Sequence, residues 1–187
     1  MKRRIPCLSV WSACLILMLT VPACRNPPQQ QSKDVVDVMP DDNEIYGWTR
    51  SQPLRIAENA TQLYALIDGK APYFTDNGFA KCAFQTFTGP VSSIPVDLEV
   101  QLYDQTDTAN CRTLYPLVAF GTETPWTGDH SGVEARIDET LFGAYRIDFW
   151  QDKFYCSITI QNKSAAGLEV AKRFAFDVAD AIKDTRQ

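Results

Sequence analysis

One stretch of the chain carries side chains that could bind a small molecule. Within residues 61–79 two tyrosines alternate with two aspartates, and a tryptophan follows in a later loop. Aromatic walls with a few polar groups are what small-molecule clefts use to hold and orient a ligand. Packing of a helical hairpin over one end of a sheet explains the same residues, so both interpretations stay open. The candidate contact residues are Tyr64, Asp68, Tyr73, Asp76 and Trp126.

The residues of acid–base and metal chemistry are few. His130 is the only histidine, and Asp129 and Ser131 directly flank it, so these three side chains cannot form a Ser–His–Asp relay among themselves. Zinc sites need clustered cysteine and histidine ligands, whereas the cysteines here stand apart. The sequence has no glycine-rich loop of the kind that cradles phosphates. We therefore expect neither a metal nor a cofactor.

Carboxylates are numerous, and two of them fall on one face of an expected strand. Asp97 and Glu99 are two residues apart, which places them about 7 Å apart along a strand. A glycoside hydrolase needs a similar separation between its two acids. A solvated sheet face predicts the same residues, and we expect Asp138, Glu139 and Asp148 to be exposed as well. A hydrolase that uses surface carboxylates is therefore an alternative function.

The first 23 residues have the features of a signal peptide. Basic residues at positions 2–4 precede an apolar run over residues 10–21, which is shorter than the roughly 20 residues that span a bilayer. The run ends in Val21-Pro22-Ala23-Cys24, which resembles a bacterial lipobox. The resemblance implies that the Cys24 thiol carries a diacylglycerol and that its amine becomes the new N-terminus. An ordinary secretory signal with a chance cysteine is the alternative.

The lipobox resemblance implies a place in the bacterial cell envelope. Several acyl chains anchor a protein far more firmly than one. Arg25 follows the cysteine, where an aspartate would resemble an inner-membrane retention signal, so we expect the outer membrane in a host with two membranes. Residues 26–31 are rich in proline and glutamine, which is typical of a disordered spacer. We therefore expect a lipidated, flexible tether over residues 24–44 and one folded domain over residues 45–187.

The charge of the chain excludes one class of partner. The chain has 18 basic and 23 acidic residues, a net charge of −5, and loss of the three basic leader residues leaves 15 against 23, or −8. Such a protein repels phosphate backbones, so we expect no nucleic acid. The expected partners are the membrane, through the lipid anchor, and an envelope protein or a small molecule.

Three cysteines fall in the expected domain, at positions 82, 111 and 156. An exported chain meets an oxidising compartment in many bacteria, and an odd number of thiols leaves at least one unpaired. Cys82 and Cys156 lie on expected strands and could form a bridge if those strands are neighbours. We favour the alternative that Cys82, Cys111 and Cys156 are all small buried apolar side chains, which is common for free cysteine.

A set of short motifs between residues 47 and 79 resembles one family. The chain is similar to the DUF6599-like proteins, an uncharacterised bacterial family, and it departs from the family pattern with Asp68 in place of asparagine and Pro72 in place of glutamate. The resemblance implies an envelope or secreted protein of unknown function. The matching residues are Gly47-Trp48, Leu63-Tyr64, Ile67-Asp68-Gly69, Ala71, Tyr73 and Gly78-Phe79.

Local signals predict the elements that would position these residues. Asn59 can cap a helix that ends at Asp68-Gly69, where we expect Gly69 to take the left-handed conformation. A second short helix runs from Pro72 to Asn77-Gly78. Strands are expected over 80–88, 96–103, 144–150 and 154–161, with a hairpin loop over 89–95 and a long exposed loop over 121–132. Helices are expected from residue 107 to 115 and from Ser164 onward.

This order of elements favours an α+β domain, in which an antiparallel sheet of about four to six strands is built from hairpins and helices pack against it. For the function we hold three hypotheses. The first is a non-enzymatic envelope lipoprotein whose domain binds a partner protein or a small ligand. The others are the hydrolase with paired carboxylates and a purely structural surface module.

Overall fold

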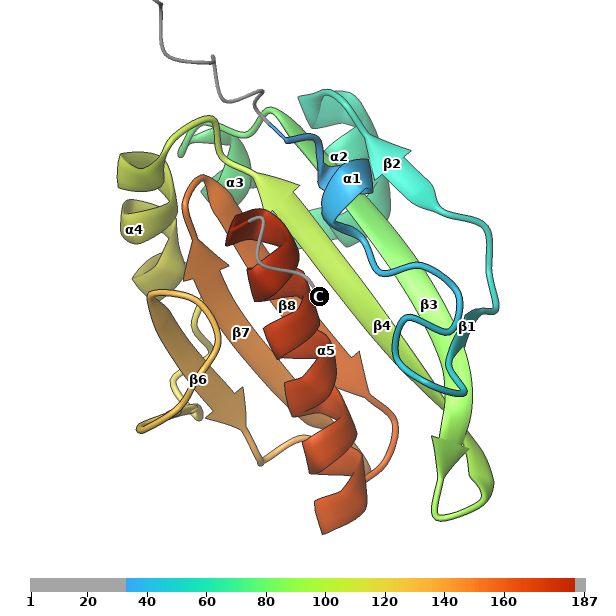
Figure 1. Ribbon diagram of the computed structural model, residues 1–187. Helices are drawn as coiled ribbons and strands as arrows, with labels where there is room; N and C mark the ends of the chain where they lie inside the picture. Colours follow the sequence, from blue (N-terminus) through green and yellow to red (C-terminus); the bar gives the residue numbers. More distant parts are fainter. Residues whose placement is uncertain (1–32, 184–187) are drawn as a thin grey trace, which may run out of the picture. The chain divides into compact units, whose positions relative to one another are not determined.

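An antiparallel sheet organises residues 33–183, which are the residues that the computed structural model describes (Figure 1). The leader and Cys24 lie outside them. The strands run in the order β1-β3-β4-β8-β7-β6-β5, and β2 also pairs with β3. The strands are β1 Thr49–Arg50, β2 Arg55–Ala57, β3 Lys81–Val91, β4 Ile94–Asp104, β5 Thr124–Pro125, β6 Glu134–Asp138, β7 Tyr145–Gln151 and β8 Phe154–Ile160. The helices are α1 Val35–Val38, α2 Ala60–Ile67, the 3-10 turn η1 Asp68–Lys70, α3 Ala71–Thr75, α4 Thr108–Leu117 and α5 Ala165–Lys183.

The predicted fold class is confirmed, but the predicted strand number is wrong. The described residues form an α+β structure with an antiparallel sheet of eight strands instead of four to six. The difference comes from β1, β2 and β5, which have two or three residues each and pair at the sheet edges. Alternation of apolar and polar residues needs at least four residues to be visible, so such strands leave no periodic signal.

The β3–β4 hairpin is longer than predicted. The ladder continues through Pro90 opposite Pro95 and Val91 opposite Ile94, inside the segment that we expected to be a loop. Only Ser92 and Ser93 form the turn, with φ of 50° and 69°, as a type I′ turn requires. In an antiparallel ladder every second pair exchanges no hydrogen bonds, so the two prolines can face each other without losing a donor.

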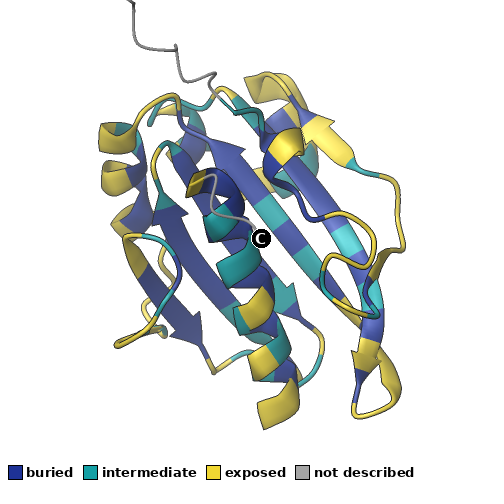
Figure 2. Ribbon diagram, viewed as in Figure 1, coloured by how far each residue is buried: buried dark blue, intermediate teal, exposed yellow. Residues whose placement is uncertain are grey.

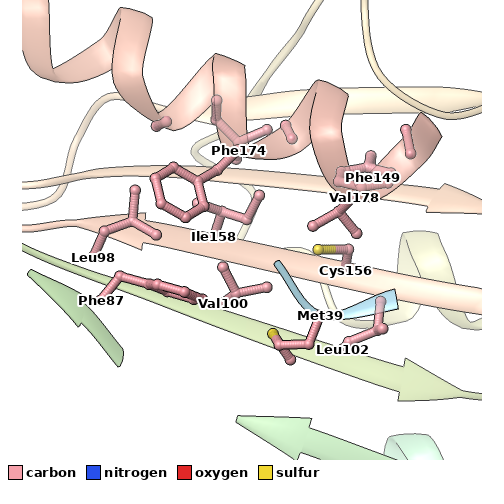
Figure 3. Close-up of a cluster of buried hydrophobic side chains, with 14 of the residues drawn as sticks. Met39, Phe87, Leu98, Val100, Leu102, Phe149, Cys156, Ile158, Phe174 and Val178 are labelled. Atoms are coloured by element: carbon pink, nitrogen blue, oxygen red, sulfur yellow. The ribbon is translucent and has the colours of Figure 1, made fainter. Parts of the chain in front are cut away.

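Helix α5 covers one face of the sheet and encloses the main core. Its N-terminus is capped as predicted, because the Ser164 Oγ accepts a hydrogen bond from the Gly167 amide at 3.1 Å. Phe174 points from α5 into the sheet, where its ring lies 5.4 Å from that of Trp48 and 5.2 Å from that of Phe87 (Figure 3). Full burial of one such aromatic side chain contributes about 1.5–3 kcal/mol. No helix among residues 33–183 has both the length and the apolar character to cross a membrane.

The folded domain begins earlier than predicted. We expected a flexible tether up to residue 44, but α1 lies within it and packs beside α5 and β3 (Figure 1). Val35 and Val38 are fully buried because they stand one helical turn apart and face the core. Asp34 and Asp37 form a capping box at the start of α1. The expectation of a tether is therefore wrong for residues 33–44.

The other face of the sheet is covered only in part. Helices α2, α3 and α4 lie behind the sheet in Figure 1, on the side away from α5. They form a second apolar cluster with aromatic side chains of the strands, among them Phe84, Tyr103 and Tyr155. Residues of β7 and β8 are mostly buried on both faces, whereas on β4 Asp97 is exposed and Glu99 and Gln101 are half-buried (Figure 2). This second layer therefore consists of three short helices and the loops that join them.

The turn after α2 differs from the prediction by one residue. Asn59 does cap α2, since its side chain accepts a hydrogen bond from the Gln62 amide. However, the positive φ of 50° belongs to Asp68, whereas Gly69 has an ordinary backbone, and a Cβ atom added to it would have no neighbouring atom within 4 Å. Gly78 does have a positive φ, 80°, as its place after α3 predicts.

These two glycines provide the first testable prediction. Gly78→Ala should lower the free energy of unfolding by about 1–3 kcal/mol, because a non-glycine residue at positive φ is strained. In addition, its Cβ would lie 2.9 Å from the Gln105 carbonyl oxygen. Gly69→Ala is the matched control and should be neutral or stabilise the domain by up to about 1 kcal/mol. Urea unfolding measures both variants, and an equal loss in the two would contradict this account.

Candidate functional site

The sheet face away from α5 carries a polar floor at its centre. Because side chains alternate along a strand, β4, β8 and β7 must present one set of residues to α5 and the other set to the opposite face. Directly opposed residues on one face lie about 4.5–5.5 Å apart between Cβ atoms, so they form rows across the strands. The register gives one row of Glu99, Thr159 and Arg146 and a second row of Gln101, Ser157 and Asp148.

A cavity of about 450 Å³ lies over this floor. That volume is within the range of about 300–1,000 Å³ that is typical of small-molecule sites. One wall comes from α2, η1 and α3, a second from the loop after α4, and Arg55 of β2 stands at the rim. The wall residues are Leu66, Ile67, Lys70, Phe74, Val118 and Phe120. The cavity thus joins apolar and aromatic walls to a floor of charged, amide and hydroxyl groups.

A network of buried charges supports one side of the floor. Arg136 Nε lies 3.2 Å from Asp148 Oδ2, and these residues are direct partners across β6 and β7. Arg146 Nη2 lies 3.0 Å from Glu123 Oε1 and 3.2 Å from Asp138 Oδ2. Paired charges can be buried where a lone charge could not, because each partner replaces part of the water lost by the other.

The buried network corrects one prediction about exposure. Asp138 and Asp148, which we expected on the surface, are 2% and 1% exposed, whereas Glu139 is exposed as predicted. Burial alone would raise the pKa of Asp138, but the hydrogen bonds from Thr140 and the charge of Arg146 lower it below its ordinary value. The prediction failed because burial of these aspartates depends on arginines on the neighbouring strand. Which arginine lies opposite which aspartate is known only once the strand register is known.

The loop after α4 is folded around another buried carboxylate. The backbone amides of Phe120, Gly121 and Thr122 donate to the Glu123 carboxylate at 2.8, 2.9 and 3.1 Å. Burial raises the pKa of Glu123, but these backbone bonds and the nearby arginines outweigh it, so the pKa is lowered. The loop therefore ties Phe120 to the charged network beneath it.

The Phe120 ring contacts two cations at the cavity wall. Lys70 Nζ lies 3.0 Å from the ring centroid and Arg146 Cζ lies 4.0 Å from it, both within the distance of a cation–π interaction. Burial, together with the positive charge of Arg146, lowers the pKa of Lys70 to about 8, although the negative charge of Asp148 opposes this shift. Lys70 also donates to the Val118 carbonyl oxygen at 3.3 Å. Among residues 33–183, no carboxylate forms an ion pair with Lys70.

Two polar atoms beside the cavity lack a hydrogen-bond partner in the described part of the chain. They are Arg146 Nε, a donor, and Asp148 Oδ1, an acceptor, and both are buried. The two side chains are neighbours on β7, with Arg146 Nε 3.5 Å from the other Asp148 oxygen, Oδ2. An unpaired buried polar group costs about 1–3 kcal/mol, so both atoms favour a polar partner.

The predicted contact residues lie outside this cavity. Tyr64 and Tyr73 are 47% and 45% exposed, and Asp68 and Asp76 are also exposed. The stretch 61–79 does contribute to the cavity, but through the side chains on the inner side of its helices. Trp126 lines a second groove, beyond β6, and packs edge-on against Phe176 of α5 with the ring centroids 5.4 Å apart. His130 lines the same groove, and its Nδ1 lies 3.1 Å from the Ser131 carbonyl oxygen.

Lys70 and Arg146, the cations of the site, were not predicted from the sequence, and Asp148 was expected only as a surface carboxylate. The alternation in Tyr145-Arg146-Ile147-Asp148-Phe149 marks a strand with one apolar and one charged face, and this signal could have placed Arg146 and Asp148 together. No comparable signal exists for Lys70, because a single lysine between two short helices is typical of a solvated turn.

The cysteines take no part in the site. Cys82, Cys111 and Cys156 are free and fully buried, which confirms the interpretation as small apolar side chains. Burial raises the pKa of Cys82 to about 11, so its thiol is neutral near pH 7. Within residues 33–183 no group of histidine, cysteine, aspartate or glutamate side chains is arranged to hold a metal ion.

Comparisons of the chain with protein-family models, with curated proteins and with solved structures find no match. The resemblance to the DUF6599-like proteins therefore stays a prediction from the motifs quoted above.

The buried ion pair gives the second prediction. Asp148→Ala should lower the free energy of unfolding by about 3–5 kcal/mol, because it leaves Arg136 buried without its carboxylate. Arg136→Met combined with Asp148→Leu removes both charges and should recover most of that loss. Asp129→Ala, at an exposed loop position, is the control and should change stability by about 0.5 kcal/mol or less. A double variant as unstable as Asp148→Ala would contradict the pairing.

The lowered pKa of Lys70 gives the third prediction. In the unfolded chain this lysine has its ordinary pKa of 10.5, against about 8 in the folded domain. Between these values the unfolded chain holds a proton that the folded chain has lost, so stability should rise with pH in this window. The comparison is with Lys70→Met, which removes this one titration and leaves all the others. Urea unfolding of both proteins at about pH 8 and about pH 10 measures the difference.

The free energy of unfolding of the wild type should rise relative to that of Lys70→Met as the pH increases from about 8 to about 10. If this difference stays constant or falls, the burial of the Lys70 cation is contradicted. The groups that set its pKa stand on three elements: Arg146 and Asp148 on β7, Arg136 on β6 and Glu123 on the loop after α4.

Proposed function

We propose that this domain is a non-catalytic binding module that holds a small molecule in the cavity on the open sheet face. We propose further that a lipid on Cys24 anchors it in the cell envelope. The observation that carries the binding proposal is the cavity itself, in which apolar walls enclose a few converging polar groups. Two of those groups, Arg146 Nε and Asp148 Oδ1, lack a partner among the described residues.

The state of the carboxylates favours binding over hydrolysis. A hydrolase with paired acids needs one carboxyl group that keeps its proton near neutral pH. The pKa values of Asp138 and Glu123 are lowered instead, and Asp148 is held by Arg136. Asp138 and Glu123 are therefore suited to orienting Arg146, and Asp148, which lines the cavity, can accept a hydrogen bond from a ligand.

The buried charges also favour binding over a purely structural role. Replacement of buried ion pairs by well-packed apolar residues is often neutral or stabilising, so stability alone does not explain such a network. A rigid, charged floor is what a site needs in order to hold its polar groups in fixed positions. The network beneath the cavity has this character.

A cavity-filling variant tests the binding proposal. Thr159 lies on the floor and is half-buried, so Thr159→Trp should fill the cavity while leaving the α5 side of the sheet intact. Thr113→Trp, on the exposed side of α4, is the control. In native mass spectrometry with a small-molecule extract of the host envelope, the wild type and the control should retain a ligand that Thr159→Trp does not. The proposal fails if no ligand is retained by the wild type, or if all three proteins retain it equally.

The proposed anchor would hold the domain close to the membrane. Eight residues separate Cys24 from Lys33, the first described residue. A chain of this length reaches at most about 30 Å when fully extended. This span is shorter than the one the predicted tether to residue 44 would allow. A ligand for the cavity would therefore be a component of the envelope near the lipid surface.

The lipid anchor gives the fourth prediction. Cys24→Ser should abolish incorporation of an alkyne-tagged fatty acid and release the protein from the membrane fraction, because the serine hydroxyl does not take the thioether-linked lipid. Cys14→Ser, within the predicted leader, is the matched control and should be labelled like the wild type. Gel fluorescence of membrane and soluble fractions measures both effects. Labelling of Cys24→Ser at the wild-type level would show that the anchor is elsewhere.

A further inference from the structure

The cations around the cavity differ in how they are neutralised. Arg55 pairs with Glu99, with Nη2 2.7 Å from Oε2. Arg146 is held by Glu123 and Asp138. Lys70 is half-buried, and among the described residues it contacts only a carbonyl oxygen and the Phe120 ring. An ammonium group has three protons to donate, so Lys70 has donor capacity left for an anionic group inside the cavity.

The floor of the cavity offers an unpaired donor and an unpaired acceptor instead of a cation. Glu99 and Gln101 are already engaged, since Gln101 Nε2 donates to Glu99 at 2.7 Å and Gln101 Oε1 accepts from the Tyr103 hydroxyl at 2.9 Å. The neighbouring Arg146 Nε and Asp148 Oδ1 remain, one a donor and the other an acceptor. A hydroxyl group both donates and accepts, so it satisfies such a pair where a carboxylate or an ammonium satisfies only one member.

The remaining walls and floor are consistent with a hydroxylated ring. Ser157 and Thr159 add hydroxyl groups to the floor beside Asp148, and Phe84 and Tyr155 add aromatic surface. Aromatic side chains can pack against the apolar C–H groups of a small ring, while the ring's hydroxyl groups reach the polar floor. The cavity volume of about 450 Å³ suits a ligand of one or two such rings.

Phe120 stands between solvent and the Arg146 guanidinium. Phe120 is 55% exposed, so its ring can leave Arg146 without opening a void in a packed core. The backbone amides of Phe120 and Gly121 are held by the Glu123 carboxylate, so the movement is a rotation of the Phe120 side chain about a fixed backbone. A ligand hydroxyl can therefore reach the Arg146–Asp148 pair after the ring moves aside.

We infer that the cavity binds a small polyhydroxylated anion, a sugar acid or a sugar phosphate, with its acidic group on Lys70 and its hydroxyl groups on Arg146 and Asp148. This inference rests on the proposed binding function and names the chemical class of its ligand. The carboxylate and the phosphate share the chemistry that Lys70 recognises, and the experiment separates them.

The test is isothermal titration calorimetry on the full mature chain in detergent, with glucuronate, glucose 6-phosphate, glucose and inorganic phosphate as probes. At least one anionic sugar should bind about tenfold or more tightly than both glucose and inorganic phosphate, because it alone offers charge and hydroxyl groups together. The tighter of glucuronate and glucose 6-phosphate assigns the acidic group. Equal binding of glucose, equal binding of inorganic phosphate, or no binding by either anionic sugar overturns the inference.

Variants assign the contacts. Lys70→Met should weaken the anionic sugar about tenfold or more and leave weak glucose binding unchanged, while Lys172→Met on α5 should have no effect. A cooperative thermal melt of Lys70→Met at or above the wild-type temperature at neutral pH shows that the fold is intact, because the variant lacks the cost of burying the cation. Lys70→Arg keeps the positive charge and should retain binding. Unchanged affinity in a folded Lys70→Met overturns the inference. If Thr159→Trp removes an envelope ligand while both anionic sugars fail to bind, this inference fails and the proposed function stands.

Discussion

The pairing of β7 with its two neighbours is the constraint on which the rest of the structure depends. Ile147 and Phe149 must face α5, so Arg146 and Asp148 must face the opposite side, because side chains alternate along a strand. A register shift of one residue would move both charges into the α5 core. Apolar packing on one face and ion pairs on the other therefore select the same register, which makes it strongly specified.

This constraint also explains why the second face of the sheet is not closed by a helix like α5. An apolar helix over Arg146 and Asp148 would bury charges without replacing their water. The chain instead uses three short helices and a loop that is folded around Glu123, whose carboxylate joins the charged network. The cavity is the space that this arrangement leaves over the floor. The polar side chains of β4, β8 and β7 thus determine both the arrangement of the second layer and the floor of the cavity.

The sequence predicts those features that repeat within a single element. The stripe on α5, the alternation in β4 and the β7–β8 hairpin all follow from local periodicity, and each is found in the structure. Features that depend on pairing were missed. Val35 and Val38 have a core to enter only because α5 and β3 meet beside them, and Asp148 can be buried only because β6 places Arg136 opposite it. The sequence alone does not reveal these distant partners.

Lys70 connects the cavity to the stability of the domain. Burial and the charges of Arg146 and Arg136 lower the pKa of Lys70, whereas Asp148 and Glu123 raise it. The pKa of Lys70 therefore depends on the whole buried network. An anion held at Lys70 would favour the protonated lysine, and any ligand that binds only the folded chain also stabilises it by mass action. The same charges therefore govern how firmly the second layer packs and what the cavity can hold. In the proposed function, an anionic ligand would offset the stability cost of burying Lys70.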